Sequence, residues 1–309
     1  MLRPFRFGVS SAIATSREEW HERVRRAEEL GYDTFVIADH LRGHLSPLVA
    51  LASAAEASRS LTFGTFVLNN DFRHPVLLAR ESATLQVLTG GRFELGLGAG
   101  HSKDEYDEAG FPFDPGPVRV QRLAESVEVI QRLFTGEPAN FAGDHYRVAN
   151  HALAPIPETP PPILIGGNAK SILRLAARKA DIVGFTGIFL GPDGAGIDFR
   201  WFTREGLEDR LEIVREAAGD RLPYLELNIL IQSVTLTDDR PKAIADIGER
   251  LPALTPEQID ACPYLLAGNA EQIAERLVDY RDRYGISYIV THAPGMEALA
   301  PVIALLKGK

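Results

Sequence analysis

The chain has 309 residues, of which 45% are hydrophobic, and its formal net charge is −9. This length allows two domains, but β/α barrels commonly reach it as one, so we expect a single domain over residues 1–309. The charge is spread along the chain without a block of Lys or Arg, which argues against nucleic acid or a membrane surface as partner.

The chain contains one cysteine, Cys262, which excludes an internal disulfide and fits a reducing cytosol. Nothing around Cys262 suggests a base partner, so we interpret it as a small buried side chain and not as a nucleophile. The first ten residues lack the apolar core of a signal peptide, and no segment is apolar for the ~18 residues of a membrane span. We therefore expect a cytoplasmic protein.

Strand and helix patterns alternate along the chain. Phe35, Val36 and Ile37 form the continuous apolar run of a strand buried on both faces, as in parallel sheets. The expected strands are residues 5–10, 34–39, 61–68, 92–98, 162–166, 181–186, 224–236 and 286–292. The expected helices are residues 17–30, 47–58, 75–88, 169–178, 203–218, 239–250, 269–284 and 296–306, with one more around 123–134. Eight β/α units close most economically into a (β/α)8 TIM barrel. An open doubly wound sheet is the alternative.

Three connections exceed a simple β/α loop, and we expect insertions after strands four, six and seven. The first covers residues 101–161, with a polar, Gly- and Pro-rich stretch at 101–117 and a hairpin around Gly143-Asp144. The second, residues 187–203, is glycine-rich and is predicted to be a lid loop.

If the barrel closes, the carboxyl ends of its strands meet at one rim, where barrel enzymes bind their ligands. The residues expected at this rim are Ser10, Asp39, His40, Leu68, Asn69, Asn70, Gly98, Ala99, Gly100, His101, Gly166, Gly167, Asn168, Thr186 and His292. Several ends carry glycine or small polar groups, which suits a flat cofactor lying against the backbone. The glycines at 96, 98 and 100 are not a dinucleotide fingerprint, because their spacing is one residue short and no β-α-β unit with a suitably placed acid follows.

The segment from Gly166 to Ser171 turns from a strand end into a helix N-terminus. Free N–H groups and the positive end of the helix dipole favour phosphate there, with Lys170 and Ser171 as further donors. A tight turn with an ordinary helix cap is the alternative.

The histidines at the rim allow more than one interpretation. His40 and His44 have the spacing of a helical zinc site, but Gly43 lies between them and no glutamate follows His40, so we expect no metal. His292 ends the last strand and is either ligand-facing or an ordinary histidine with internal partners.

Several of these motifs resemble the luciferase-like monooxygenase superfamily. They are Asp39-His40 after strand two, the stretch 66–75 after strand three, the stretch 91–100 with Glu105, Tyr106 and Gly110, and Ile165-Gly166-Gly167. In combination they are similar to the actinobacterial branch that uses the deazaflavin coenzyme F420. The resemblance extends over nearly the whole chain.

The resemblance implies a β/α barrel, a homodimer, and a deazaflavin at the carboxyl rim. It implies a non-prolyl cis peptide between Phe66 and Val67. It also implies that His40 and Asp39 are the catalytic residues, with His40 as the acid/base and Asp39 also in contact with the cofactor. The other cofactor-binding residues expected are Phe66, Val67, Leu68, Asn69, Gly98, Ala99, Gly100, Ile165, Gly166, Gly167 and Asn168. The residues expected to face the substrate are His44, His101, Thr186 and His292.

The chain departs from the F420-dependent glucose-6-phosphate dehydrogenases at two motif positions. Those enzymes have Glu and Trp where this chain has His101 and His44, which argues against phosphosugar oxidation. Our leading hypothesis is an F420-dependent oxidoreductase that transfers a hydride between deazaflavin C5 and a small organic substrate. Reduction of an activated double bond or imine is favoured over alcohol oxidation. The alternatives are an FMNH2- and O2-dependent monooxygenase, a metal-dependent barrel hydrolase using His40, His44 and His292, and a non-catalytic cofactor-binding protein.

Overall fold

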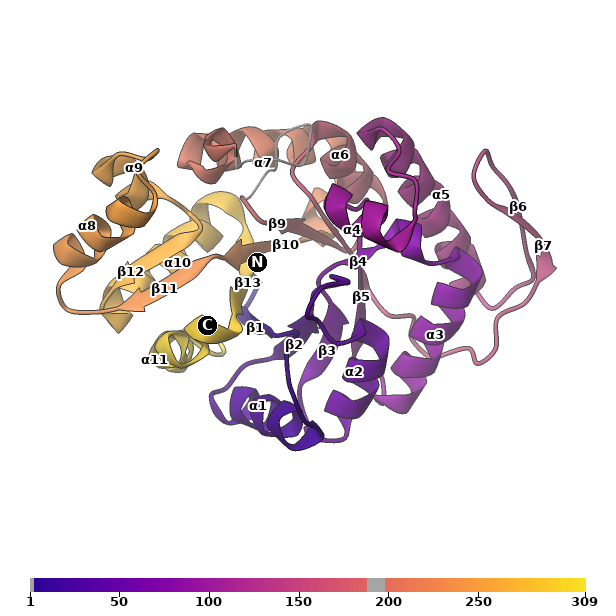
Figure 1. The fold of residues 1–309 in the computed structure, drawn as a ribbon, viewed down its shortest axis with the longest axis horizontal. Helices are drawn as coiled ribbons and strands as arrows, with labels where there is room; N and C mark the ends of the chain where they lie inside the picture. Colours follow the sequence, from indigo (N-terminus) through magenta and orange to yellow (C-terminus); the bar gives the residue numbers. More distant parts are fainter. Residues whose placement is uncertain (1–2, 188–197) are drawn as a thin grey trace.

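The computed structural model describes residues 3–187 and 198–309. Its main sheet is a closed parallel barrel ringed by helices (Figure 1). The barrel strands are β1 (Arg6–Ser10), β2 (Thr34–Ile37), β3 (Thr62–Thr65) continued by β4 (Leu68–Asn69), β5 (Phe93–Gly98), β8 (Ile163–Gly166), β9 (Ile182–Phe185), β10 (Glu226–Ile231) and β13 (Ile286–His292). The barrel closes because β3 pairs with β2 on one side and β5 on the other. The predicted TIM barrel is confirmed.

Helices cover the outside of the barrel (Figure 1). They are α1 (Arg17–Glu29), α2 (Pro47–Ala55), α3 (Pro75–Leu88), α5 (Gly116–Phe134), α6 (Lys170–Lys179), α7 (Arg204–Ala218), α10 (Ala270–Tyr284) and α11 (Met296–Leu306). Local sequence explains their limits. The Ser16 side chain accepts from the Glu19 N–H to begin α1, and Gly285 ends α10 at a φ of 77° that favours glycine.

The inside of the barrel has two layers of different chemistry. At the amino end, the Arg6 guanidinium binds the carboxylates of Glu94 and Glu226 and lies 3.8 Å from the centroid of the Tyr288 ring. Burial raises the pKa of Glu94. Nearer the carboxyl rim the filling is apolar: Val36, Phe66, Leu164, Ile182, Leu230 and Val290 pack together, with Val67 partly exposed above them. The barrel is therefore a filled core, and its ligand surface lies at the rim.

The insertion between β5 and β8 contains one element that the sequence did not predict. Residues 101–117, which the sequence showed only to be polar and rich in Gly and Pro, include the short helix α4 (Lys103–Ala109). Glu105 and Tyr106 are buried, so α4 is held by its docking onto the barrel rim. The predicted hairpin is present as β6 (Ala139–Ala142) and β7 (Arg147–His151).

The prediction of one strand over residues 224–236 was also wrong. The alternation covers two strands, and β11 (Ser233–Leu236) leaves the barrel to pair with β12 (Leu265–Gly268). The break falls at Gln232, whose N–H donates to the Tyr264 carbonyl oxygen at 2.8 Å. Together with α8 (Arg240–Arg250) and α9 (Pro256–Ala261), this small sheet projects from one edge of the barrel (Figure 1).

The predicted lid covers residues 187–203. Most of it, residues 188–197, lies outside the described residues. Its final part forms the 3-10 helix Phe199–Phe202, after which α7 begins. In the described part of the chain, no helix combines the length and hydrophobicity needed to cross a membrane.

Cys262 is buried, and its Sγ donates to the Phe202 carbonyl oxygen at 3.0 Å. Burial raises the pKa of the thiol to about 12. We predict that a thiol reagent labels essentially none of the native protein and one equivalent after denaturation in urea, because the reactive thiolate is suppressed in the fold. Rapid labelling of the native protein would contradict this placement of Cys262.

Candidate functional site at the carboxyl rim of the barrel

The barrel registers bring most of the predicted residues to one rim. Ser10 pairs with Val36 of β2 and with His292 of β13, and Asn69 of β4 pairs with Gly98 of β5. Gly166 of β8 pairs with Gly184 of β9. Residues from distant parts of the chain thus meet at the carboxyl ends of neighbouring strands, as the sequence predicted.

Val67 forms an apolar floor at this rim, and the backbone at Gly98 and Gly166 forms a glycine wall beside it. The predicted non-prolyl cis peptide Phe66-Val67 is present between β3 and β4. A Cβ placed on Gly98 would lie 2.6 Å from Val67 Cγ2, and one on Gly166 would lie 3.3 Å from Val67 Cγ1. Side chains at positions 98 and 166 would therefore fill the space beside Val67. The residues present fit a flat ring that lies on Val67 between two stretches of bare backbone.

Asp39 holds this part of the rim together. Its carboxylate accepts from the Asn69 N–H at 3.0 Å and from the Arg73 guanidinium. Asn69 in turn accepts at Oδ1 from the Tyr106 hydroxyl at 2.9 Å. Asp39 therefore fixes the backbone that follows the cis peptide, and its carboxylate is already engaged by protein donors.

His40 forms a pair with Glu105, the residue that sequence reasoning missed as part of the site. His40 Nδ1 lies 2.7 Å from Glu105 Oε1, and Glu105 Oε2 accepts from the Leu41 N–H at 3.1 Å. The Glu105 side chain is 9% exposed and that of His40 is 32% exposed. Although burial opposes the charged form of Glu105, the hydrogen bonds from His40 and Leu41 hold its pKa below the ordinary value. A carboxylate on Nδ1 leaves Nε2 as the nitrogen that can face a ligand.

Two further imidazoles surround His40. The ring centroids of His44 and His101 lie 5.0 Å and 5.5 Å from that of His40, both edge-on. Burial, followed by the charge of His40, lowers the pKa of each. His101 is exposed to solvent. The predicted proximity of His40, His44 and His101 is therefore observed.

The turn from β8 into α6 has the features expected of an anion site. A Cβ on Gly167 would lie 2.6 Å from Ile172 Cγ2, so this turn requires glycine. α6 begins after Ala169, and no side chain caps its first N–H groups. Asn168 Nδ2 donates to Thr186 Oγ1 at 2.9 Å, while its Oδ1 accepts from the buried Arg210. Lys170 and Ser171 are exposed. Arg210 is a second residue that sequence reasoning missed.

His292 has an internal partner. Its Nε2 lies 3.2 Å from Gln232 Oε1, and Gln232 Nε2 donates to the Thr186 carbonyl oxygen at 3.0 Å. Burial lowers the pKa of His292. This link ties the ends of β9, β10 and β13 together and supports an orienting role for His292. Across residues 3–187 and 198–309, no three His, Cys, Asp or Glu side chains are arranged to hold a metal ion.

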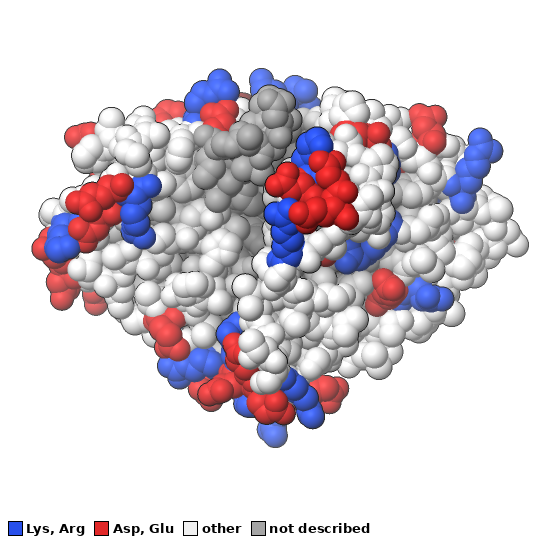
Figure 2. Space-filling view, viewed as in Figure 1, with Lys and Arg blue, Asp and Glu red and all other residues white. Residues whose placement is uncertain are grey.

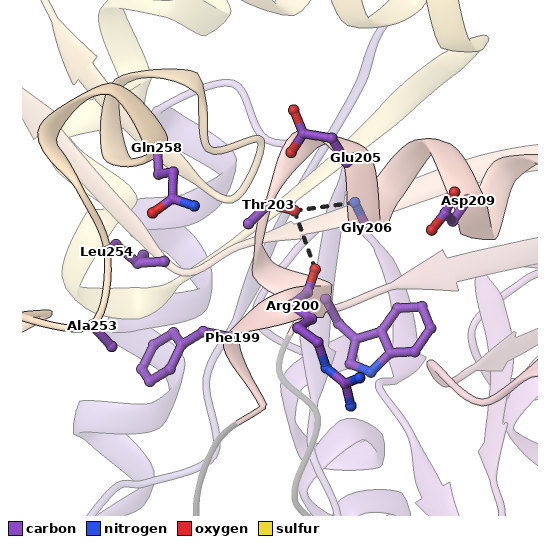
Figure 3. Close-up of a pocket in the computed structure, with 10 residues that line it drawn as sticks. Phe199, Arg200, Thr203, Glu205, Gly206, Asp209, Ala253, Leu254 and Gln258 are labelled. Carbon is purple, nitrogen blue, oxygen red and sulfur yellow. Dashed lines mark hydrogen bonds between the residues drawn. The ribbon is translucent and has the colours of Figure 1, made fainter.

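A cavity of about 520 Å³ lies away from these residues (Figure 3). Phe199 and Arg200 line one side and Ala253, Leu254 and Gln258 the other, where the start of α7 faces the α8–α9 connection. It contains none of the predicted cofactor or substrate residues. On the face seen in Figure 2, acidic and basic side chains are interspersed without a large area of one sign.

Fold and rim together define a class: a β/α barrel with an imidazole–carboxylate pair beside a glycine-walled apolar floor. Residues 1–244 match the model of the luciferase-like monooxygenase family, so the chain belongs to this family. The F420-dependent glucose-6-phosphate dehydrogenase of Intrasporangium calvum is 31% identical over 312 residues, which cover 93% of this chain and 92% of that protein.

Two solved structures share the fold. The coenzyme F420 dependent tetrahydromethanopterin reductase of Methanopyrus kandleri has a TM-score of 0.79 at 18% identity and covers 99% of this chain and 100% of its own. An F420-dependent secondary alcohol dehydrogenase, solved with an F420-acetone adduct, has a TM-score of 0.77 at 19% identity with the same coverage. The family resemblance drawn from the motifs is confirmed.

Proposed function

We propose that this protein is an F420-dependent oxidoreductase that transfers a hydride between C5 of the deazaflavin and a small organic substrate, with His40 as acid or base. The observation that carries the proposal is the His40–Glu105 pair, 2.7 Å apart, at the same rim as the Val67 floor and its glycine wall. The 31% identical relative supports F420 as the cofactor.

In this proposal the chain's residues divide the work by position. Val67 supports one face of the ring, the bare backbone at Gly98 and Gly166 borders it, and the turn at Gly166-Gly167 receives the phosphate. The bound deazaflavin supplies the hydride chemistry, and the protein supplies orientation and proton transfer. Phe66, Leu68, Ala99, Gly100 and Ile165 complete the proposed cofactor contacts.

His40 would hold or deliver the proton at Nε2. Glu105 accepts from Nδ1, so it fixes both the tautomer and the ring orientation of His40. His44 and His101 border the same space, and burial favours their neutral forms. His40 is thus the imidazole whose protonated form has a carboxylate partner.

We further propose that the substrate is not a phosphosugar. His101 and His44 stand where the phosphosugar enzymes resembled by this chain have Glu and Trp, and both imidazoles lie beside His40. Neutral imidazoles both donate and accept hydrogen bonds, which suits a carbonyl, an imine or an activated alkene. Thr186 and His292 would complete the substrate side through Gln232.

A parallel turnover assay tests this function. Oxidised F420 is offered with glucose 6-phosphate and with secondary alcohols, reduced F420 with cyclic enones and imines, and FMNH2 with oxygen. We expect turnover with reduced F420 and an enone or imine, and none with glucose 6-phosphate. Turnover only with FMNH2 and oxygen would overturn the proposal and favour the monooxygenase alternative.

Replacing Glu105 with Gln tests the pairing. Without the carboxylate, the His40 ring loses the acceptor that fixes its tautomer and its orientation. We expect kcat to fall by about ten- to a hundredfold. The control is Glu108→Gln, because Glu108 lies on the same helix but pairs with Arg42 at the surface. A kcat for Glu105→Gln equal to that of the wild type would contradict the pairing role.

A further inference from the structure

Arg210 is a charged side chain in α7 with no exposed surface. Nε donates to the Gly206 carbonyl oxygen at 2.8 Å and Nη2 to the Trp201 carbonyl oxygen at 2.6 Å. The Tyr264 hydroxyl and Asn168 Oδ1 accept the remaining bonds. Every one of these acceptors is neutral, and within the described ranges no carboxylate pairs with the guanidinium.

The surroundings of Arg210 offset its charge only in part. The rings of Tyr264, Trp201 and Phe185 have centroids 5.6 Å, 5.8 Å and 6.0 Å from its Cζ, at the outer limit of cation–π attraction. Burial lowers the pKa of Arg210, yet a guanidinium stays protonated in proteins. A buried ion normally has a counter-ion, because its lost hydration is otherwise uncompensated. Among the residues that the structure describes, Arg210 is therefore a buried positive charge without a counter-ion.

The position of this charge suggests what its counter-ion is. Asn168, which binds Arg210, follows Gly167 in the turn and precedes Ala169, the N-cap residue of α6. The positive end of the α6 dipole and its uncapped N–H groups lie at the same turn. Asn168 also bonds Thr186 at the end of β9, so the Arg210 contact fixes this part of the rim.

We propose that Arg210 is the buried counter-charge for the phosphate of the bound cofactor. It acts through Asn168: the guanidinium orients the amide, and its field adds to that of the α6 N-terminus at the Gly166-Gly167 turn. Arg210 is a positioning residue, because it has no surface from which to touch the ligand itself. This inference rests on the proposed function, and it assigns the charge complementarity of that site to a side chain outside the phosphate turn.

A purely structural clamp is the competing explanation, since Arg210 joins the β8–α6 turn, the 3-10 helix Phe199–Phe202 and the segment before β12. The two roles predict different effects on the binding of ligands with and without a phosphate. A clamp affects a deazaflavin with phosphate and one without it alike, whereas a counter-charge affects only the phosphate-bearing ligand.

The test titrates two probes by fluorescence: F420, and the same deazaflavin ring carrying only its ribityl chain. Asn168→Asp is the most informative variant, because a carboxylate at this position would pair with Arg210 and neutralise it in place. We expect this variant to raise Tm, to weaken F420 binding by about tenfold or more, and to leave the phosphate-free probe within about twofold. Arg210→Gln should show the same selective loss with a lower Tm, and Arg210→Lys should retain part of the preference.

Arg221→Met is the matched control. Arg221 donates to the carbonyl oxygens of Ala177 and Ala180 at 2.6 Å and 2.8 Å, at the opposite end of α6. Its loss should lower Tm without changing the ratio of the two affinities. If Arg210→Gln does not fold, Asn168→Asp and the wild-type affinity ratio still decide.

Equal losses for both probes in Asn168→Asp, or no loss for either, would overturn the inference. So would a wild-type protein that binds both probes equally, although F420 binding itself, and hence the proposed function, would then stand. A wild-type protein that binds neither probe would overturn both.

Discussion

Replacing His40 with Ala is expected to lower kcat with F420 and the reducible substrate by about 10²- to 10⁴-fold, the usual loss for a positioned acid/base group. The imidazole of His40 delivers the proton, and Glu105 holds it in position. A water molecule that replaced the ring would not be held in the same position. The affinity for F420 should change by less than about threefold, because the ring lies on Val67 and the phosphate on the Gly166-Gly167 turn. Stopped-flow turnover and fluorescence titration measure the two quantities.

His21→Ala is the control for this experiment. His21 lies on α1 and bonds Ser53 of α2 at 2.9 Å, outside the barrel rim, so its removal should leave kcat unchanged. If His40→Ala instead retained wild-type turnover, the acid/base assignment would be wrong. The non-catalytic binding-protein alternative predicts that no variant alters a turnover, because none occurs.

Replacing Arg6 with Met is expected to destabilise the fold by about 3–5 kcal/mol, because it leaves the Glu94 carboxylate buried without its partner. The Glu94 side chain is 5% exposed and that of Arg6 25% exposed. Burial raises the pKa of Glu94, and loss of Arg6 raises it further. The folded variant then binds a proton at Glu94 more readily than its unfolded chain does. The loss in its free energy of unfolding relative to the wild type should therefore grow as pH rises through the pKa of Glu94. Urea unfolding at about pH 5 and about pH 8 measures this trend.

Two comparisons make the Arg6 result specific. Arg26→Met removes an exposed pair with Glu297 and should have little effect on the free energy of unfolding. The double variant Arg6→Met, Glu94→Leu should be more stable than the single one, because it removes the stranded charge. A double variant as unstable as Arg6→Met would show that packing around Arg6, and not the charge of Glu94, causes the loss.

The barrel was predictable because its signals are local. The apolar run at Phe35, Val36 and Ile37 and the matching runs elsewhere specify buried parallel strands regardless of their partners, and strand order follows from chain order. Rim residues such as Asp39 and Gly98 follow from the strand ends. The split of residues 224–236 into β10 and β11 was not predictable from alternation, since Gln232 turns only because Tyr264 binds its N–H.

The two missed site residues depend on contacts between distant parts of the chain. Glu105 reaches His40 across 65 residues, and only the docking of α4 onto the rim creates the pair. Arg210 had a sequence signal that was overlooked. It lies at helical spacing among Leu207, Leu211 and Val214, the buried face of α7, where a charged residue needs a reason.

The central claim is that the rim holds a deazaflavin, and parallel fluorescence titrations of the purified protein with F420, FMN and NADPH test it most directly. We predict saturable quenching with F420 at a Kd of about micromolar order and no comparable binding of the other two. Selective binding of FMN, or no binding of F420, would contradict it.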